Sequence, residues 1–157
     1  MTLFEKCAAG KFEPYTSDYA LGELEDAPDE KRGKMIALIE KYNIAVLSAS
    51  DEAKELADRY ISDGALPQGS RADAEHIAVA VVGDLDIIVS LNFRHILRPK
   101  TIELTRVINK ILGYNAAQIL LPMEVIDSEK TRLSFWTRFT QHAARLTKKS
   151  NICQRLK

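Results

Sequence analysis

The stretch SRADAEHIAVAVVGDLDIIVSLNFRHI, residues 70–96, carries the clearest signals of secondary structure in the chain. Its first residues are rich in ionisable groups, and an unbroken apolar run follows from Ile77 to Val82. Ser70 before this segment and Gly83 after it are residues that begin and end helices, so the pattern predicts a helix over 70–83. The apolar run LDIIVSL, residues 85–91, then predicts a buried strand, and Asn92 follows it directly.

The same alternation of helix and strand extends along the chain in both directions. Because the apolar runs of the predicted strands are continuous, the strands are expected to be buried on both faces, as in a mostly parallel sheet. The sequence therefore predicts an α/β domain with helices on both faces of the sheet. The other predicted strands cover residues 11–17, 43–50 and 117–122, and the other predicted helices cover residues 3–9, 17–24, 35–41, 50–64 and 101–112.

The C-terminal residues differ from the rest in charge. Residues 127–157 carry eight Lys or Arg against Asp127 and Glu129, a local charge of +6, so the first 126 residues sum to −6 in a chain of zero net charge. The spacing of apolar residues predicts an amphipathic helix over 129–148. We therefore expect two parts, a domain over 1–126 and a basic C-terminal helix or tail over 127–157, which is expected to contact something anionic, including the acidic body itself.

Bulk properties exclude several classes of protein. A length of 157 residues suits one domain, and zero net charge gives no reason to expect nucleic acid or a membrane as a partner. The two cysteines, Cys7 and Cys153, form no disulfide framework or metal-binding spacing, which indicates a reducing cytoplasm. There is no signal peptide or apolar stretch of transmembrane length, so no membrane association is expected.

Three oxygen-bearing side chains are predicted to converge at one edge of the sheet. Glu23 lies in the helix after the first strand, Asp73 in the first turn of helix 70–83, and Asn92 directly after strand 85–91. All three positions fall at the carboxyl ends of the strands, where ligand sites of such sheets lie. Carboxylate and amide oxygens are the ligands that Mg²⁺ or Mn²⁺ prefers. The sequence thus predicts a site for a hard cation that could activate water for phosphodiester hydrolysis.

Each of these residues also has a purely structural interpretation. Ser70 and Asp73 resemble a capping box, Glu23 has the features of a solvated helix acid, and Asn92 suits the turn that ends a strand. Arg94 and His95 could be surface residues. His76, at the front of a buried helix, is more typical of a packed, hydrogen-bonded histidine than of a metal ligand.

Three segments together resemble the PIN-domain proteins, in the branch related to VapC-type toxins. They are TSDYALGELEDAP, the stretch 70–96 quoted above, and LGYNAAQILLPMEVI, and the resemblance spans about residues 4–126. It implies a PIN-like three-layer α/β/α sandwich around a mostly parallel central sheet, N-terminally truncated, to which the predicted C-terminal helix is an addition. It also implies a ribonuclease that depends on Mg²⁺ or Mn²⁺.

The resemblance assigns roles to individual residues. Glu23 matches the second family acid, Asp73 the third, and Asn92 the fourth position, where an amide in place of Asp should weaken metal binding. Asp73, Glu23 and Asn92 are thus the expected metal ligands and catalytic residues, and Arg71, Arg94 and His95 are expected to contact the phosphates of RNA.

The chain departs from the family pattern at its start. The family begins with a strand that ends in an Asp, and no residue here matches it; Asp18 does not, because it follows the next strand. Two explanations stay open: a truncated reading frame, or a degenerate family member. A missing central strand would leave a gap of unpaired backbone groups, which a homodimer or the tail could cover.

Two functions therefore compete at this stage. One is a cytoplasmic ribonuclease of the toxin–antitoxin type, with weakly bound Mg²⁺ or Mn²⁺, RNA as substrate and an antitoxin-like protein as partner. The other is a non-catalytic PIN-type module that binds RNA or protein, which the absent first Asp favours.

Overall fold

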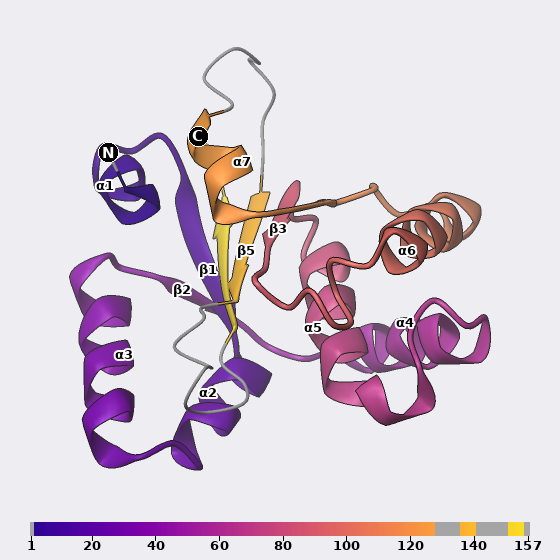
Figure 1. The fold of residues 1–157 in the computed structure, drawn as a ribbon, viewed down its shortest axis with the longest axis horizontal. Helices are drawn as coiled ribbons and strands as arrows, with labels where there is room; N and C mark the ends of the chain where they lie inside the picture. Colours follow the sequence, from indigo (N-terminus) through magenta and orange to yellow (C-terminus); the bar gives the residue numbers. More distant parts are fainter. Residues whose placement is uncertain (1, 128–135, 141–150, 156–157) are drawn as a thin grey trace.

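The computed structural model describes residues 2–127 and the backbone of residues 136–140 and 151–155, and it shows a mixed α/β fold (Figure 1). The helices are α1 (Leu3–Ala8), α2 (Asp18–Glu25), α3 (Asp29–Lys41), α4 (Asp51–Ser62), the short 3₁₀ turn η1 (Gln68–Ser70), α5 (Arg71–Val82), α6 (Pro99–Leu112) and α7 (Pro122–Asp127). The strands are β1 (Glu13–Ser17), β2 (Ala45–Leu47), β3 (Ile87–Val89), β4 (Gln118–Leu120), β5 (Trp136–Thr140) and β6 (Asn151–Arg155).

The strands form one sheet in the order β2-β1-β6-β5-β3-β4. The pairs β1–β2, β3–β4 and β3–β5 are parallel, as the sequence predicts for most of the sheet. β6 is the exception, since it runs antiparallel to both of its neighbours, β1 and β5. Figure 1 shows α2 and α3 at one side of this sheet and α4, α5 and α6 at the other.

Most helix boundaries follow the local signals in the sequence. The side chain of Ser17 accepts a hydrogen bond from the backbone N–H of Ala20 at the start of α2, and Ser50 does the same with Ala53 at the start of α4. Gly113 ends α6 in the left-handed conformation, at φ 82°, which glycine adopts without the steric cost of a Cβ. Each of these helix boundaries is thus set by a residue within a few positions of it.

Strand β3 faces a different hydrophobic core on each side. Ile88 packs with α4, α5 and α6 in a first core, which includes Tyr60 and Ile77. Ile87 and Val89 pack instead with residues of α1, α2, α3 and α7 in a second core. Because successive side chains of a strand point to opposite faces, β3 is buried on both faces, as its continuous apolar run predicts.

The prediction of burial on both faces is wrong for β2. Ala45 and Val46 are exposed, Val46 by 46%. The reason is position: β2 is an edge strand with one neighbour, β1. An apolar run does not distinguish an edge strand from a central one.

The prediction of an extra C-terminal helix is wrong at residues 136–140, which form strand β5. The segment WTRFT consists largely of aromatic and β-branched residues, which favour strands. Pairing with β3 and β6 gives its backbone hydrogen-bonding groups partners. The other parts of the predicted helix, 129–135 and 141–148, lie outside the described residues.

The two strands of the C-terminal segment, β5 and β6, follow β4 in the chain but lie inside the sheet. β5 and β6 lie between β1 and β3 (Figure 1). From the sequence, we expect a gap in the sheet that the tail or a second copy could cover. β1 pairs with β6 from Glu13 opposite Arg155 to Thr16 opposite Ile152. The C-terminal segment therefore joins the two halves of the sheet through backbone hydrogen bonds.

Candidate functional site

The carboxyl ends of the parallel strands bring together the elements that carry the predicted site. β1 leads directly into α2, which carries Glu23, and β3 ends at Val89, three residues before Asn92. α5 begins at the same edge and carries Asp73 in its first turn. The structure therefore places the predicted residues on neighbouring elements.

Asp73 and Asn92 are in direct contact. The Asn92 Nδ2 atom donates a hydrogen bond to Asp73 Oδ1 at 2.8 Å, although 19 residues separate them in the chain. The Asn92 Oδ1 atom accepts from the backbone N–H of His95 at 3.1 Å, and the Asn92 N–H donates to Ser90 Oγ at 3.0 Å. Asn92 thus fixes the loop after β3 to the first turn of α5, and its side-chain oxygen is already engaged.

The capping-box interpretation of Asp73 is wrong. Ser70 stands at the N-cap of α5 but makes no side-chain capping bond, and it is buried inside the turn η1. The carboxylate of Asp73 faces Asn92. A negative charge in the first turn still suits the positive end of the helix dipole.

Glu23 is held by the histidine of the next helix. Glu23 Oε1 lies 3.2 Å from His76 Nε2, and the side chains are exposed by 16% and 1%, respectively. The interpretation of His76 as a packed, hydrogen-bonded residue is confirmed, and that of Glu23 as a solvated acid is wrong. The ring of Tyr19 packs edge-on against that of His76, with centroids 6.3 Å apart. The pair joins α2 to α5 and orients the Glu23 carboxylate.

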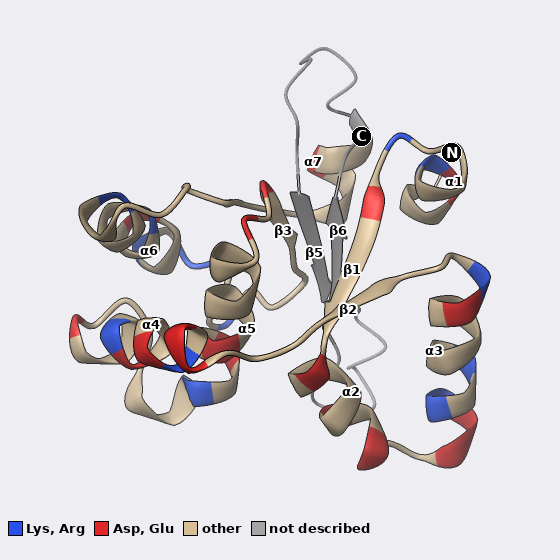
Figure 2. Ribbon diagram, turned by 180° about the vertical axis from the view of Figure 1, so that it is seen from behind, with Lys and Arg blue, Asp and Glu red and all other residues tan. Residues whose placement is uncertain are grey.

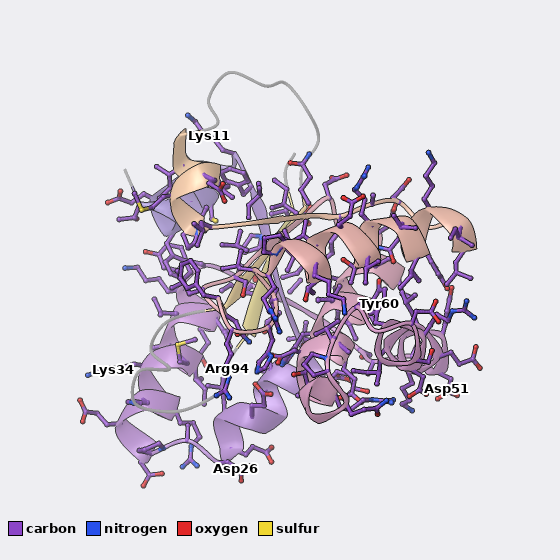
Figure 3. The ribbon with its side chains drawn as sticks, turned by 45° about the vertical axis from the view of Figure 1, so that its right-hand side comes forward. Lys11, Asp26, Lys34, Asp51, Tyr60 and Arg94 are labelled. Carbon is purple, nitrogen blue, oxygen red and sulfur yellow. The ribbon has the colours of Figure 1, made fainter. Side chains whose placement is uncertain are left out.

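The three predicted phosphate contacts differ in availability. Arg71 donates to Glu75 Oε1 at 2.7 Å and also to Asp58, and these two carboxylates hold the pKa of Arg71 above its ordinary value. Its charge is therefore neutralised within the protein. Arg94 is exposed, and Figure 3 shows it on the side of the edge where α2 lies. His95 is half-buried, and its backbone N–H is bound to Asn92.

Phe93 is a neighbour of the site that the sequence reasoning missed. Its side chain is 63% exposed, directly after Asn92 and before Arg94. An exposed aromatic ring beside a cation can stack on an unpaired nucleobase. The signal was present in the sequence, since an aromatic residue lies outside the apolar run that ends at Leu91.

The donor set fits a divalent cation in part. Asp73 and Glu23 provide carboxylate oxygens at the edge, of the type that Mg²⁺ prefers. Asn92 Oδ1 accepts from the His95 N–H, which leaves its second lone pair for a metal. Among the side chains that the structure describes, no group of three His, Cys, Asp or Glu residues is close enough to hold an ion. A metal at this edge would therefore take part of its ligands from water or substrate.

Comparisons with known proteins identify no relative. No family model matches the chain, no curated protein is similar to it, and no solved structure matches its fold. Across the part of the chain that the structure describes, we find no helix with both the length and the apolar character needed to span a bilayer.

Proposed function

We propose that this protein has the PIN-type α/β/α sandwich and acts as a metal-dependent ribonuclease of the VapC-like toxin branch. Asp73 and Glu23 would hold Mg²⁺ or Mn²⁺ weakly, and the substrate would be RNA. An antitoxin-like protein partner and a homodimer belong to the same proposal. The observation that carries it is the meeting of Asp73 and Asn92 at 2.8 Å, at the carboxyl edge of β3.

The residues at this edge would have distinct tasks. Asp73 would be the principal ligand, and His76 would keep the Glu23 carboxylate turned toward the edge. A bound Mg²⁺ or Mn²⁺ lowers the pKa of water and neutralises charge on a phosphodiester. Arg94 would bind a phosphate, and Asn92 would hold the loop that carries Arg94 and His95 against α5.

The test measures metal binding and RNA cleavage on the same samples. We expect Mn²⁺ to bind in calorimetric titration at millimolar concentration, and labelled single-stranded RNA to be cleaved when Mn²⁺ or Mg²⁺ is present. Asp73→Asn, which removes the charge and keeps the shape, should abolish both signals. Asn92→Ala should reduce the rate of cleavage, because it releases the loop after β3 from α5.

Asp26→Asn is the matched control, because it makes the same chemical change on an exposed carboxylate at the end of α2 (Figure 3). It should leave metal binding and cleavage unchanged. The ribonuclease proposal is wrong if Asp73→Asn still cleaves RNA. It is also wrong if the wild type binds no Mn²⁺ at concentrations of about 10 mM.

A second candidate is a non-catalytic PIN-type module that binds RNA or a protein. The lack of a group of three His, Cys, Asp or Glu side chains among those described favours it. RNA that binds with equal affinity with and without metal, and is recovered intact, would support this candidate. Metal-dependent turnover that Asp73→Asn removes would exclude it.

A further inference from the structure

A pocket of about 320 Å³ lies between the end of α4, the turn η1 and the start of α6. Small-molecule sites range from about 300 to 1,000 Å³, so this one suits a small ligand. One part of its wall is apolar, from Ile61, Ala65, Leu66 and Pro67, and the rest carries Gln68, Arg98, Lys100 and Thr101.

The charged side chains of this wall are both cationic. Arg98 and Lys100 contribute to the lining, which contains no Asp or Glu. Neither makes an ion pair in the part of the chain that the structure describes. The acid that follows α4, Asp63, accepts from Arg59 at 2.7 Å, so its charge is already matched. Figure 2 shows the neighbouring acidic residues spread along α4.

The backbone around the pocket positions the lysine. Lys100 Nζ lies against Gly64, where an added Cβ would be 3.9 Å from it. Gly64 has a φ of +74°, which favours glycine over other residues, and the ammonium group takes the space beside it. Thr101 joins the start of α6 to the loop after α4, because its Oγ1 donates to the carbonyl of Ala65 at 2.9 Å.

The start of α6 adds a positive potential to the same wall. α6 is 14 residues long, and its N-terminus has no side-chain cap. Pro99 has no N–H, so the donors of this first turn that lack a carbonyl partner within the helix and favour an anion are the N–H groups of Lys100 and Thr101. The pocket therefore favours an anionic group, because it has two cations, an uncapped helix N-terminus and no lining acid. Its apolar wall favours a ligand with a flat or apolar part.

We propose that this pocket binds a nucleotide, with the phosphate at Arg98 and Lys100 and the base against Ile61 and Pro67. The Gln68 amide is placed to hydrogen-bond the edge of the base. The source of the nucleotide is either a free nucleoside monophosphate or one unit of an RNA chain. This site is distinct from the Asp73 edge and does not depend on any cleavage there.

The experiment titrates the full-length protein with AMP, adenosine, inorganic phosphate and a short single-stranded RNA, by calorimetry and by ¹H–¹⁵N NMR. We expect AMP to bind with a Kd below about 1 mM and to shift the amide signals of Gly64, Lys100 and Thr101. Adenosine and phosphate should each bind at least about tenfold more weakly, because each keeps half of the contacts. RNA that binds more tightly than AMP at the same amides indicates a chain as the source, and the reverse order indicates the free nucleotide.

The variants are Arg98→Gln and Lys100→Gln, each expected to weaken AMP binding about tenfold. Lys110→Gln is the matched control, an exposed lysine at the other end of α6, and it should leave the Kd unchanged. The proposal is overturned if AMP at a concentration of about 10 mM does not bind. It is also overturned if the shifted amides lie elsewhere, or if both pocket variants bind AMP as the wild type does. Circular dichroism of each variant checks that it is folded.

Discussion

The two cores on either side of β3 differ in how completely they exclude water. In the first core, α5 buries a nearly continuous series from Ala74 to Val81, and Tyr60 lies fully buried with a hydrogen bond of 2.5 Å to Asn109 (Figure 3). On the side of the second core, α3 presents Met35 as its buried side chain, and β2 is largely exposed. The side chains of the second core are slightly more exposed, up to 8% for Cys7, although both faces of β3 are covered.

This difference divides the candidate site between the two regions. Asp73 lies on α5, in the first core, whereas Glu23 lies on α2, beside the second, and Asn92 follows β3, which faces both. The contact between Glu23 and His76 crosses from one region to the other. The position of Glu23 therefore depends on its contact with the His76 side chain. The position of Asp73 depends on the buried helix α5.

The largest expected effect tests the cores themselves. Ile88→Ala removes a side chain with 0% exposure from the first core and should lower the free energy of unfolding by about 3–4 kcal/mol. Val46→Ala in β2, at 46% exposure, should lower it by less than about 0.5 kcal/mol. Urea unfolding followed by circular dichroism measures both, and equal losses would show that the two regions do not differ.

An intermediate effect is expected at the contact between the regions. Glu23→Ala removes the partner of His76 and should cost about 1–2 kcal/mol, because a buried polar group loses a hydrogen bond. Hydrogen exchange should quicken in α2 and stay unchanged in α5. Glu25→Ala, an exposed change in the same helix, is the control. Faster exchange in both helices would mean that Glu23 supports the whole edge.

The smallest effect concerns water exclusion in the second core. Burial raises the pKa of the Cys7 thiol from near 9 to about 12, so the folded state favours the neutral thiol. The resulting stabilisation is present below pH 9 and is lost as the pH rises toward 12. The stability difference between wild type and Cys7→Ala should therefore shrink by about 1 kcal/mol from pH 7 to pH 10. A constant difference would show that water reaches this core.

Local signals in the sequence were sufficient for most helices and for β3. Ser17, Ser50 and Gly113 act through hydrogen bonds or backbone angles within a few residues, so their effects are visible in a short window. The contact between Asp73 and Asn92 at the carboxyl end of β3 followed from the order of strands and helices. The contact of Glu23 with His76 did not, because the pair joins residues 53 positions apart.

The errors share a physical cause, which is dependence on distant partners. Residues 136–140 are a strand because β3 and β6 lie beside them, and β2 is exposed because no strand lies beyond it. Ser70 has the chemistry of a cap but sits in a 3₁₀ turn that turns its side chain inward. In each case the local preference of a short segment competes with contacts to residues far away in the sequence, and a short segment does not reveal those contacts.

The pairing of β1 with β6 has a consequence for how the chain folds. Thr16 lies opposite Ile152, so 136 positions of chain must be synthesised before these partners can meet. Contacts of such high sequence separation slow folding, because the entropy of closing a long loop is lost before any pairing compensates for it. On the ribosome, β1 and β3 would wait with unpaired edges while the rest of the chain emerges. A chaperone that binds extended backbone has its longest opportunity in that interval.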